Sequence, residues 1–199
     1  MDKRLFLATA GLAGLMPATA ALAATSGTRS PGLLTVSGAV GKTNRGALDP
    51  VTDQMMAKHG IRFDKAFVFE AGDLQRLPQV TIRPTLEYDG KPHALKGPLL
   101  TSVLQAAGVA PGASMSLGLR AVDGYNAAVS LADAAAWRMV VATHIDGQPM
   151  ALGGLGPQWA VYDADSLPAF KTSRSTSASR CAPGACITST SRRPDGRAG

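Results

Sequence analysis

Residues 114–131 read SMSLGLRAVDGYNAAVSL, and this stretch predicts two strands joined by a tight turn. Ser114–Arg120 has the composition of a first strand, and Tyr125–Leu131 has that of a second. Asp123-Gly124 between them is typical of a turn, because these residue types tolerate the backbone angles that tight turns need. The stretch therefore predicts a pair of strands that run in opposite directions.

The rest of the middle of the chain holds more strand candidates than helix candidates. Strands are expected over Leu33–Val40, Lys65–Glu70, Gln79–Tyr88, Met139–His144 and Trp159–Tyr162. Helices are expected over Asp49–His59, Ala71–Leu77, Leu99–Ala107 and Leu131–Ala136. Strand and helix do not alternate regularly, so the predicted fold class is α+β, mostly β, in a single domain over residues 25–170.

The composition is that of a folded domain and argues against a nucleic-acid partner. The chain has 199 residues, of which 45% are apolar, enough for one domain with a buried core. Its formal net charge is +6, but residues 25–170 carry equal numbers of basic and acidic side chains. The excess lies at the two ends, mainly in residues 171–199. No basic groove is therefore expected in the folded part.

Residues 1–24 have the pattern of a secretory signal peptide. A short basic start, Lys3-Arg4, precedes an apolar run from Leu5 to Met16, and Ala21-Leu22-Ala23 has the form of a cleavage site. The apolar run is too short to span a bilayer, so no stable membrane anchor is expected after cleavage. We expect a periplasmic protein. Both the general secretory route and the twin-arginine route stay open, since Lys3-Arg4 resembles a twin-arginine signal.

The composition changes abruptly after Phe170. Residues 171–199 hold ten Ser/Thr and no aromatic residue. Two interpretations stay open: a disordered basic tail, or translation in a shifted frame. Read one base earlier, the codons of residues 178–189 permit Arg-Phe-Ala-Leu-Cys-Ala-Trp-Gly-Leu-Tyr-His-Ile, a good terminal strand. The only two cysteines, Cys181 and Cys186, lie in this segment, and their spacing matches no standard zinc site.

Several segments, taken in order, resemble the oxidoreductase molybdopterin-binding domain of the sulfite-oxidase type. They span about Leu33 to Tyr162 and are Leu34–Gly38, Leu77-Pro78, Leu95–Leu104, Ala107–Val109, Ala121–Tyr125, Val141–Met150 and Gly153–Pro157. The ordered set carries the resemblance rather than any single motif. It implies a three-layer, mostly β, α+β fold with a pterin cleft. It also implies redox chemistry at molybdenum, typically oxygen-atom transfer to or from sulfur.

The chain departs from this family at the metal ligand. In the family, a cysteine near the end of the strand corresponding to Val80–Tyr88 gives a thiolate to molybdenum, a soft ligand that helps set the metal's electronics. Here Thr85–Gly90 contains no cysteine. The expected function is an exported molybdopterin-dependent oxidoreductase-like domain whose catalysis is in doubt, with molybdopterin or no cofactor bound. The alternative is a non-catalytic periplasmic binding module for a small anionic ligand or a protein partner.

Four residues are candidates for the cofactor cleft: Arg83, Asp123, Tyr125 and His144. Arg83 would pair with a pterin phosphate or an anionic substrate, and His144 would donate to a phosphate or substrate oxygen. Asp123 and Tyr125 would place a carboxylate and a phenol at the rim. Each also has an ordinary structural role open to it, in a turn, at the surface or as a satisfied histidine. No catalytic residue and no metal ligand is assigned, since the three histidines share no ligand spacing.

Overall fold

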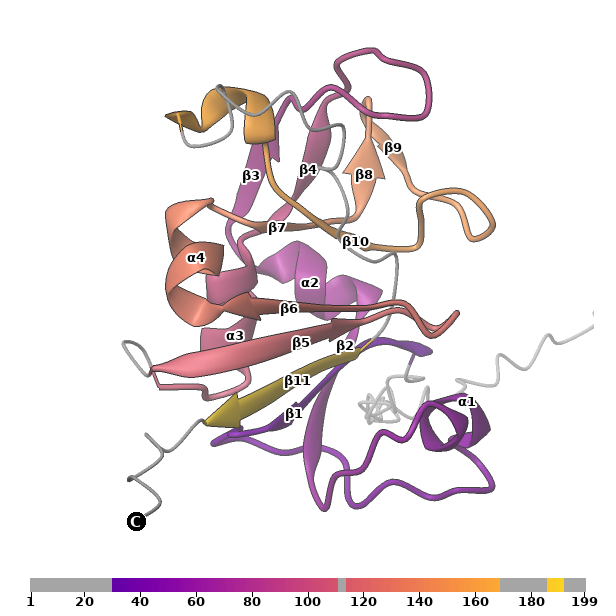
Figure 1. The fold of residues 1–199 in the computed structure, drawn as a ribbon. Coiled ribbons are helices and arrows are strands. Elements are labelled where there is room, and N and C mark those ends of the chain that lie inside the picture. Colours follow the sequence, from indigo (N-terminus) through magenta and orange to yellow (C-terminus); the bar gives the residue numbers. More distant parts are fainter. Residues whose placement is uncertain (1–29, 111–113, 169–185, 192–199) are drawn as a thin grey trace, which may run out of the picture.

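The hairpin at residues 114–131 forms one edge of a five-stranded sheet in the computed structural model, which describes residues 30–110, 114–168 and 186–191 (Figure 1). β5 (Met115–Arg120) pairs antiparallel with β6 (Asn126–Ser130), and Leu117 lies opposite Val129. The sheet order is β2-β1-β11-β5-β6, where β1 is Gly32–Gly38, β2 is Ala66–Glu70 and β11 is Cys186–Ser191.

The central strand of this sheet, β11, comes from the far end of the sequence. It runs parallel to β1 and antiparallel to β5, so it joins the N-terminal strand pair to the hairpin (Figure 1). This strand takes up six residues of the segment 171–199, for which the sequence predicts a disordered or frameshifted tail. Cys181 and the expected signal peptide, residues 1–24, lie outside the described residues.

A four-stranded sheet lies above the first one in Figure 1. Its order is β3-β4-β8-β9, where β3 is Gln79–Ile82, β4 is Leu95–Pro98, β8 is His144–Ile145 and β9 is Gln148–Pro149. Asp146 and Gly147 join β8 to β9 with φ angles of 48° and 82°, the left-handed conformation that tight hairpins require. A two-stranded sheet, β7 (Val140–Ala142) with β10 (Trp159–Val161), lies between the larger sheets (Figure 1).

Short helices pack on the five-stranded sheet: α2 (Ala71–Arg76), α3 (Leu100–Ala106) and α4 (Leu131–Ala136). Leu74 of α2 and Leu100 and Val103 of α3 are fully buried in one cluster with Leu34 and Leu117 of the sheet. A 3-10 turn, Ala164–Ser166, follows β10. The described chain is thus a single α+β domain with more strand than helix, as the sequence predicts.

The strand expected over Gln79–Tyr88 is shorter in the structure. It ends at Ile82, because Pro84 has no N–H group with which to continue the ladder of an edge strand. Residues 83–94 instead form a loop that returns to β4. The sequence of β4, LKGP, has no β-branched residue, and local composition therefore gives no sign of this strand.

The helix expected over Asp49–His59 is also shorter, since α1 covers only Gln54–Lys58. The Asp49 carboxylate accepts from Val51 N at 2.8 Å, and the Asp53 carboxylate accepts from Asp49 N at 3.0 Å. These local bonds hold residues 49–53 in turns rather than in a helix. No helix in the described ranges is long and apolar enough to cross a membrane.

Candidate functional site

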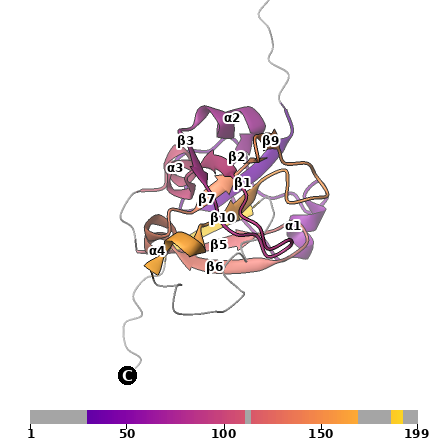
Figure 2. The ribbon, with the colours of Figure 1, turned by 90° about the horizontal axis from the view of Figure 1, so that it is seen from above.

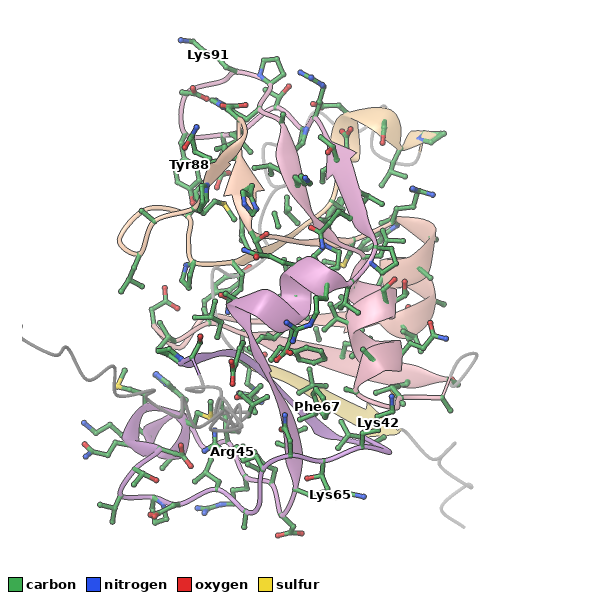
Figure 3. The ribbon with its side chains drawn as sticks, turned by 180° about the vertical axis from the view of Figure 1, so that it is seen from behind. Lys42, Arg45, Lys65, Phe67, Tyr88 and Lys91 are labelled. Atoms are coloured by element: carbon green, nitrogen blue, oxygen red, sulfur yellow. The ribbon has the colours of Figure 1, made fainter. Side chains whose placement is uncertain are left out.

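The loop of residues 83–94 folds back on itself beside the β8–β9 hairpin (Figure 3). Leu86 N donates to Lys91 O and Gly90 N donates to Leu86 O, both at 2.9 Å. Thr85 N donates to the Asp165 carboxylate at 3.0 Å and ties the loop to the 3-10 turn. The loop therefore has a defined shape, with Leu86 buried and Tyr88 68% exposed at its tip.

His93 fastens this loop to the turn between β8 and β9. Its Nδ1 lies 2.6 Å from Asp146 Oδ2, and its Nε2 lies 3.0 Å from Asp89 Oδ2. Asp146 adds a bond of its own, because its Oδ1 accepts from Ala94 N at 2.9 Å. We call Asp89, His93 and Asp146 the histidine clamp.

The hydrogen bonds of the histidine clamp favour the charged form of each member. The bonds to Asp146 and then to Asp89 raise the pKa of His93 above its ordinary value of 6.5. In return, the bond from His93 lowers the pKa of Asp146 and that of Asp89. Both ring nitrogens of His93 are thus engaged with carboxylates. The clamp holds the loop against the β8–β9 turn.

An open cavity of about 500 Å³ lies next to the clamp, a volume typical of small-molecule sites. We call it the Tyr88 cleft, and its lining residues are Leu86, Tyr88, Asp89, His93, Gly153, Gly154 and Leu155. The leucines and the tyrosine ring form apolar walls, the glycines present bare backbone, and the clamp stands at one corner. This arrangement suits an apolar ring or chain that carries one polar group.

Two of the four residues expected in the cofactor cleft belong to the same sheet as the Tyr88 cleft. Arg83 follows β3 and is exposed, and its charge adds to the effect of His93 in lowering the pKa of Asp146. His144 lies in β8, with its Nδ1 2.9 Å from Thr143 Oγ1. Neither residue is among those that line the cleft.

The other two expected residues, Asp123 and Tyr125, lie in the turn between β5 and β6. Asp123 Oδ1 accepts from Tyr125 N at 3.0 Å, a bond internal to the turn. Gly124 packs on His59 at the end of α1, and a Cβ on this glycine would lie 2.6 Å from the imidazole Cε1. Figure 2 shows α1 and α4 at opposite ends of this hairpin. The structure thus places the four expected residues on two different sheets.

No motif or spacing in the sequence marks His93 as a site residue. The signals it did offer were the turn pairs Asp89-Gly90 and Asp146-Gly147, each of which contains one carboxylate of the clamp. No sequence pattern shows that the two turns meet, because 53 residues separate His93 from Asp146.

A second cavity of about 500 Å³, beside β2, is a weaker candidate. Its polar side chains already bond to one another or to the backbone. Arg45 pairs with Asp53, Asn44 bonds to Val68 N and O at 2.7 and 2.8 Å, and Glu70 caps α2. These groups stabilise the local fold. Figure 3 shows Arg45 and Tyr88 towards opposite ends of the molecule, so the two cavities are separate.

The Tyr88 cleft does not fit a molybdenum cofactor. The family resemblance puts the metal ligand within Thr85–Gly90, which holds no thiolate. The described residues that line the cleft include no Cys, which would hold the metal, and no Lys or Arg, which would pair with a pterin phosphate. His93, the one cationic group there, is already bonded to two carboxylates. Within residues 30–110, 114–168 and 186–191, no group of His, Cys, Asp and Glu is arranged to hold a metal ion.

Solved structures include distant matches to this chain. The chain is similar to the sulfane dehydrogenase SoxCD from Paracoccus pantotrophus, with 13% sequence identity and a TM-score of 0.49. The alignment covers 80% of this chain and 38% of the other, so this chain spans less than half the length of that protein. No family model matches the chain, and no curated protein matches it.

Proposed function

We propose that this chain is a non-catalytic binding domain and that the Tyr88 cleft is its ligand site. One observation carries the proposal: a cavity of about 500 Å³ has apolar walls and a polar corner held by three hydrogen-bonded charges. A preformed site of this kind binds well because few side chains and loops lose conformational freedom when the ligand binds. Among the described residues that line the cleft, His93 bonds to two carboxylates, and Asp89 bonds to His93 and to Lys91 N.

The charge of the cleft defines the class of ligand. The clamp sets two carboxylates against one imidazolium, and Asp89 lines the cleft while Arg83 does not. A neutral or cationic ligand is therefore favoured over the small anion that the sequence led us to expect. The exposed ring of Tyr88 adds a face on which an aromatic ring stacks or an ammonium group rests.

We propose that the domain acts in the periplasm on a small-molecule ligand and does not bind nucleic acid. The support is the signal-peptide pattern of residues 1–24 and the even balance of charge over residues 25–170. Fractionation of a cell that makes the full chain tests the location. The expected result is a shortened protein in the periplasmic fraction, and a full-length protein in the cytoplasm would contradict the proposal.

A pair of probes with the same ring and opposite charge tests the ligand class. Tryptamine and indole-3-acetate differ mainly in the charge of the side chain, and titration calorimetry measures the Kd of each. We expect tryptamine to bind more tightly, and Tyr88→Ala to weaken its binding by about tenfold, because one aromatic wall is lost. Val51→Ala removes an exposed apolar side chain from the loop before α1 and should leave the Kd unchanged. Tighter binding of indole-3-acetate, or no effect of Tyr88→Ala, would reject this site.

Metal analysis separates the binding domain from the oxidoreductase that the family resemblance implies. The full chain is purified from a host that makes the molybdenum cofactor, and molybdenum is measured per chain. We expect a value at background, because the cleft lacks a thiolate and free cations. A stoichiometric value would restore the molybdopterin-dependent oxidoreductase as the function.

A further inference from the structure

The two outer edges of the five-stranded sheet differ. The outer edge of β2 is covered, because the Asn44 side chain bonds to the N–H and to the C=O of Val68 at 2.7 and 2.8 Å. Ala66 N also donates to Arg45 O at 3.0 Å. β6 is the last strand at the other edge, and no strand of the described residues pairs with its outer side. Within the part of the chain that the structure describes, this sheet is therefore open to a further strand at β6 alone.

The hydrogen bonds of the β5–β6 hairpin determine which backbone groups lie on this open edge. Ala121 N donates to Tyr125 O at 2.8 Å, so these two residues form a hydrogen-bonded pair next to the turn. Bonded and non-bonded pairs alternate along two antiparallel strands. Asn126 and Ala128 therefore direct their N–H and C=O groups away from β5, and Ser130 directs its N–H group the same way.

β6 lacks the features that usually protect an open edge. Proteins keep such edges from pairing with charged side chains, with proline or with a bulge. The strand reads NAAVS, without a charge or a proline, and its register with β5 is continuous. Asn126 and Ala128 are exposed. Figure 2 shows β6 on the outer side of β5. The edge is therefore suited to pairing with another strand.

The sequence of β6 is complementary to itself. Ala127 and Val129 pack against the buried cluster of the sheet, whereas Asn126, Ala128 and Ser130 alternate with them and lie on the other face. Two copies that pair antiparallel about Ala128 would place Asn126 of each opposite Ser130 of the other. On the apolar face, Ala127 would lie opposite Val129. Polar side chains thus meet polar ones, and apolar side chains meet apolar ones.

We infer that the open edge of β6 is an interaction surface for a second copy of this chain. The two β6 strands pair antiparallel about a two-fold axis at Ala128, and the two five-stranded sheets become continuous. Ala128 N of each copy donates to Ala128 O of the other, so both copies use the same surface. The turn before β6 adds Val122 and Tyr125, which are 55% and 41% exposed, at each end of the pairing. This inference is independent of the Tyr88 cleft.

Sedimentation of the full chain over a wide range of concentration tests the dimer. β6 has five residues, so the interface is small, and we expect a reversible dimer with a Kd in the micromolar range. Ala128→Pro removes the outward N–H from both copies and should raise this Kd by about tenfold or more. Ala128→Ser keeps the N–H and a small side chain, so this matched control should leave the Kd unchanged. A monomer at every concentration, or a dimer that Ala128→Pro leaves intact, would overturn the inference.

Ala128→Lys tests the same contact through charge and decides the question if the proline variant does not fold. Two lysines would face each other across the two-fold axis, so we expect a higher Kd at low salt that falls again at high salt. Gln75→Lys adds the same charge at an exposed site of α2 and is the control. Equal Kd values for the two lysine variants would overturn the inference.

Discussion

His93 and Asp146 stand 53 residues apart in the sequence, and Nδ1 of the histidine lies 2.6 Å from Oδ2 of the aspartate. This bond joins the loop that carries Tyr88 to the hairpin of β8 and β9. Asp146 also accepts from Ala94 N, so it holds the loop by both carboxylate oxygens. The shape of the Tyr88 cleft therefore depends on one turn residue in the left-handed conformation, with φ of 48°.

Replacing His93 by Gln should loosen the loop and weaken ligand binding together. The substitution removes the positive charge that bridges Asp89 and Asp146 and leaves the two carboxylates facing each other. We expect a lower melting temperature and a several-fold higher Kd for tryptamine by calorimetry. Lys65→Gln removes one positive charge from an exposed site at the other end of the molecule and is the control (Figure 3). Unchanged binding in His93→Gln would show that the clamp does not shape the cleft.

The pH dependence of stability should carry the signature of the clamp. The pKa of His93 is raised above 6.5, so its contribution is fully present below pH 6.5 and is lost as pH rises through the raised value. The pKa values of Asp89 and Asp146 are lowered below 3.8, so their contribution is present above pH 3.8 and is lost as pH falls through the lowered values. The histidine clamp therefore contributes its full stabilisation of the fold between pH 3.8 and pH 6.5.

Denaturant unfolding of the full chain and of His93→Gln at several pH values checks this window. The difference in the free energy of unfolding should be largest near pH 5 and should shrink above neutral pH. Arg83 and Lys91 are the other charges that act on these carboxylates, and both proteins retain them. A difference that grows with rising pH would contradict the charged form of His93.

Gly97 tests how closely β4 packs against β7. A Cβ at this position would lie 1.9 Å from Val141 O and 2.8 Å from Ala142 Cα, which are backbone atoms that cannot swing aside. Gly97→Ala should therefore lower the free energy of unfolding by about 2 kcal/mol or more. Gly46→Ala is the matched control, because nothing lies within 4 Å of its Cβ position. Similar stability of the two variants in chemical denaturation would show that the sheets are not in this contact.

The sequence predicted those elements whose signals are local. Asp123-Gly124 marks the β5–β6 hairpin, and the apolar runs before and after it are enough to place both strands. β4 and β11 could not be predicted, because LKGP has no β-branched residue and CITSTS lacks the alternation of apolar and polar residues that marks a strand. Both segments are strands because each pairs with a neighbouring strand on both sides. β4 lies between β3 and β8, and β11 lies between β1 and β5.

The candidate site was less accessible to sequence reasoning than the fold. Arg83 and His144 were expected in a cleft, and they lie in or beside the sheet that carries one, but they do not line it. The residues that do line it come from two loops about 60 positions apart, and no fixed spacing links them. In the sequence, Asp89 and Asp146 are recognisable only as turn residues. Their hydrogen bonds to His93 depend on the contact between the two turns in the folded chain.

Gly124 and His59 offer a separate test of how α1 is held against the β5–β6 hairpin. Gly124 has a φ of 93°, and a Cβ there would lie 2.6 Å from the imidazole of His59. Gly124→Ala should therefore cost about 1–3 kcal/mol from backbone strain and more from the clash. His59→Ala removes the clash but not the strain, so the double variant should recover only part of the loss, which chemical denaturation of all four proteins measures. Simple addition of the two single effects would show that the turn and the end of α1 are not in contact.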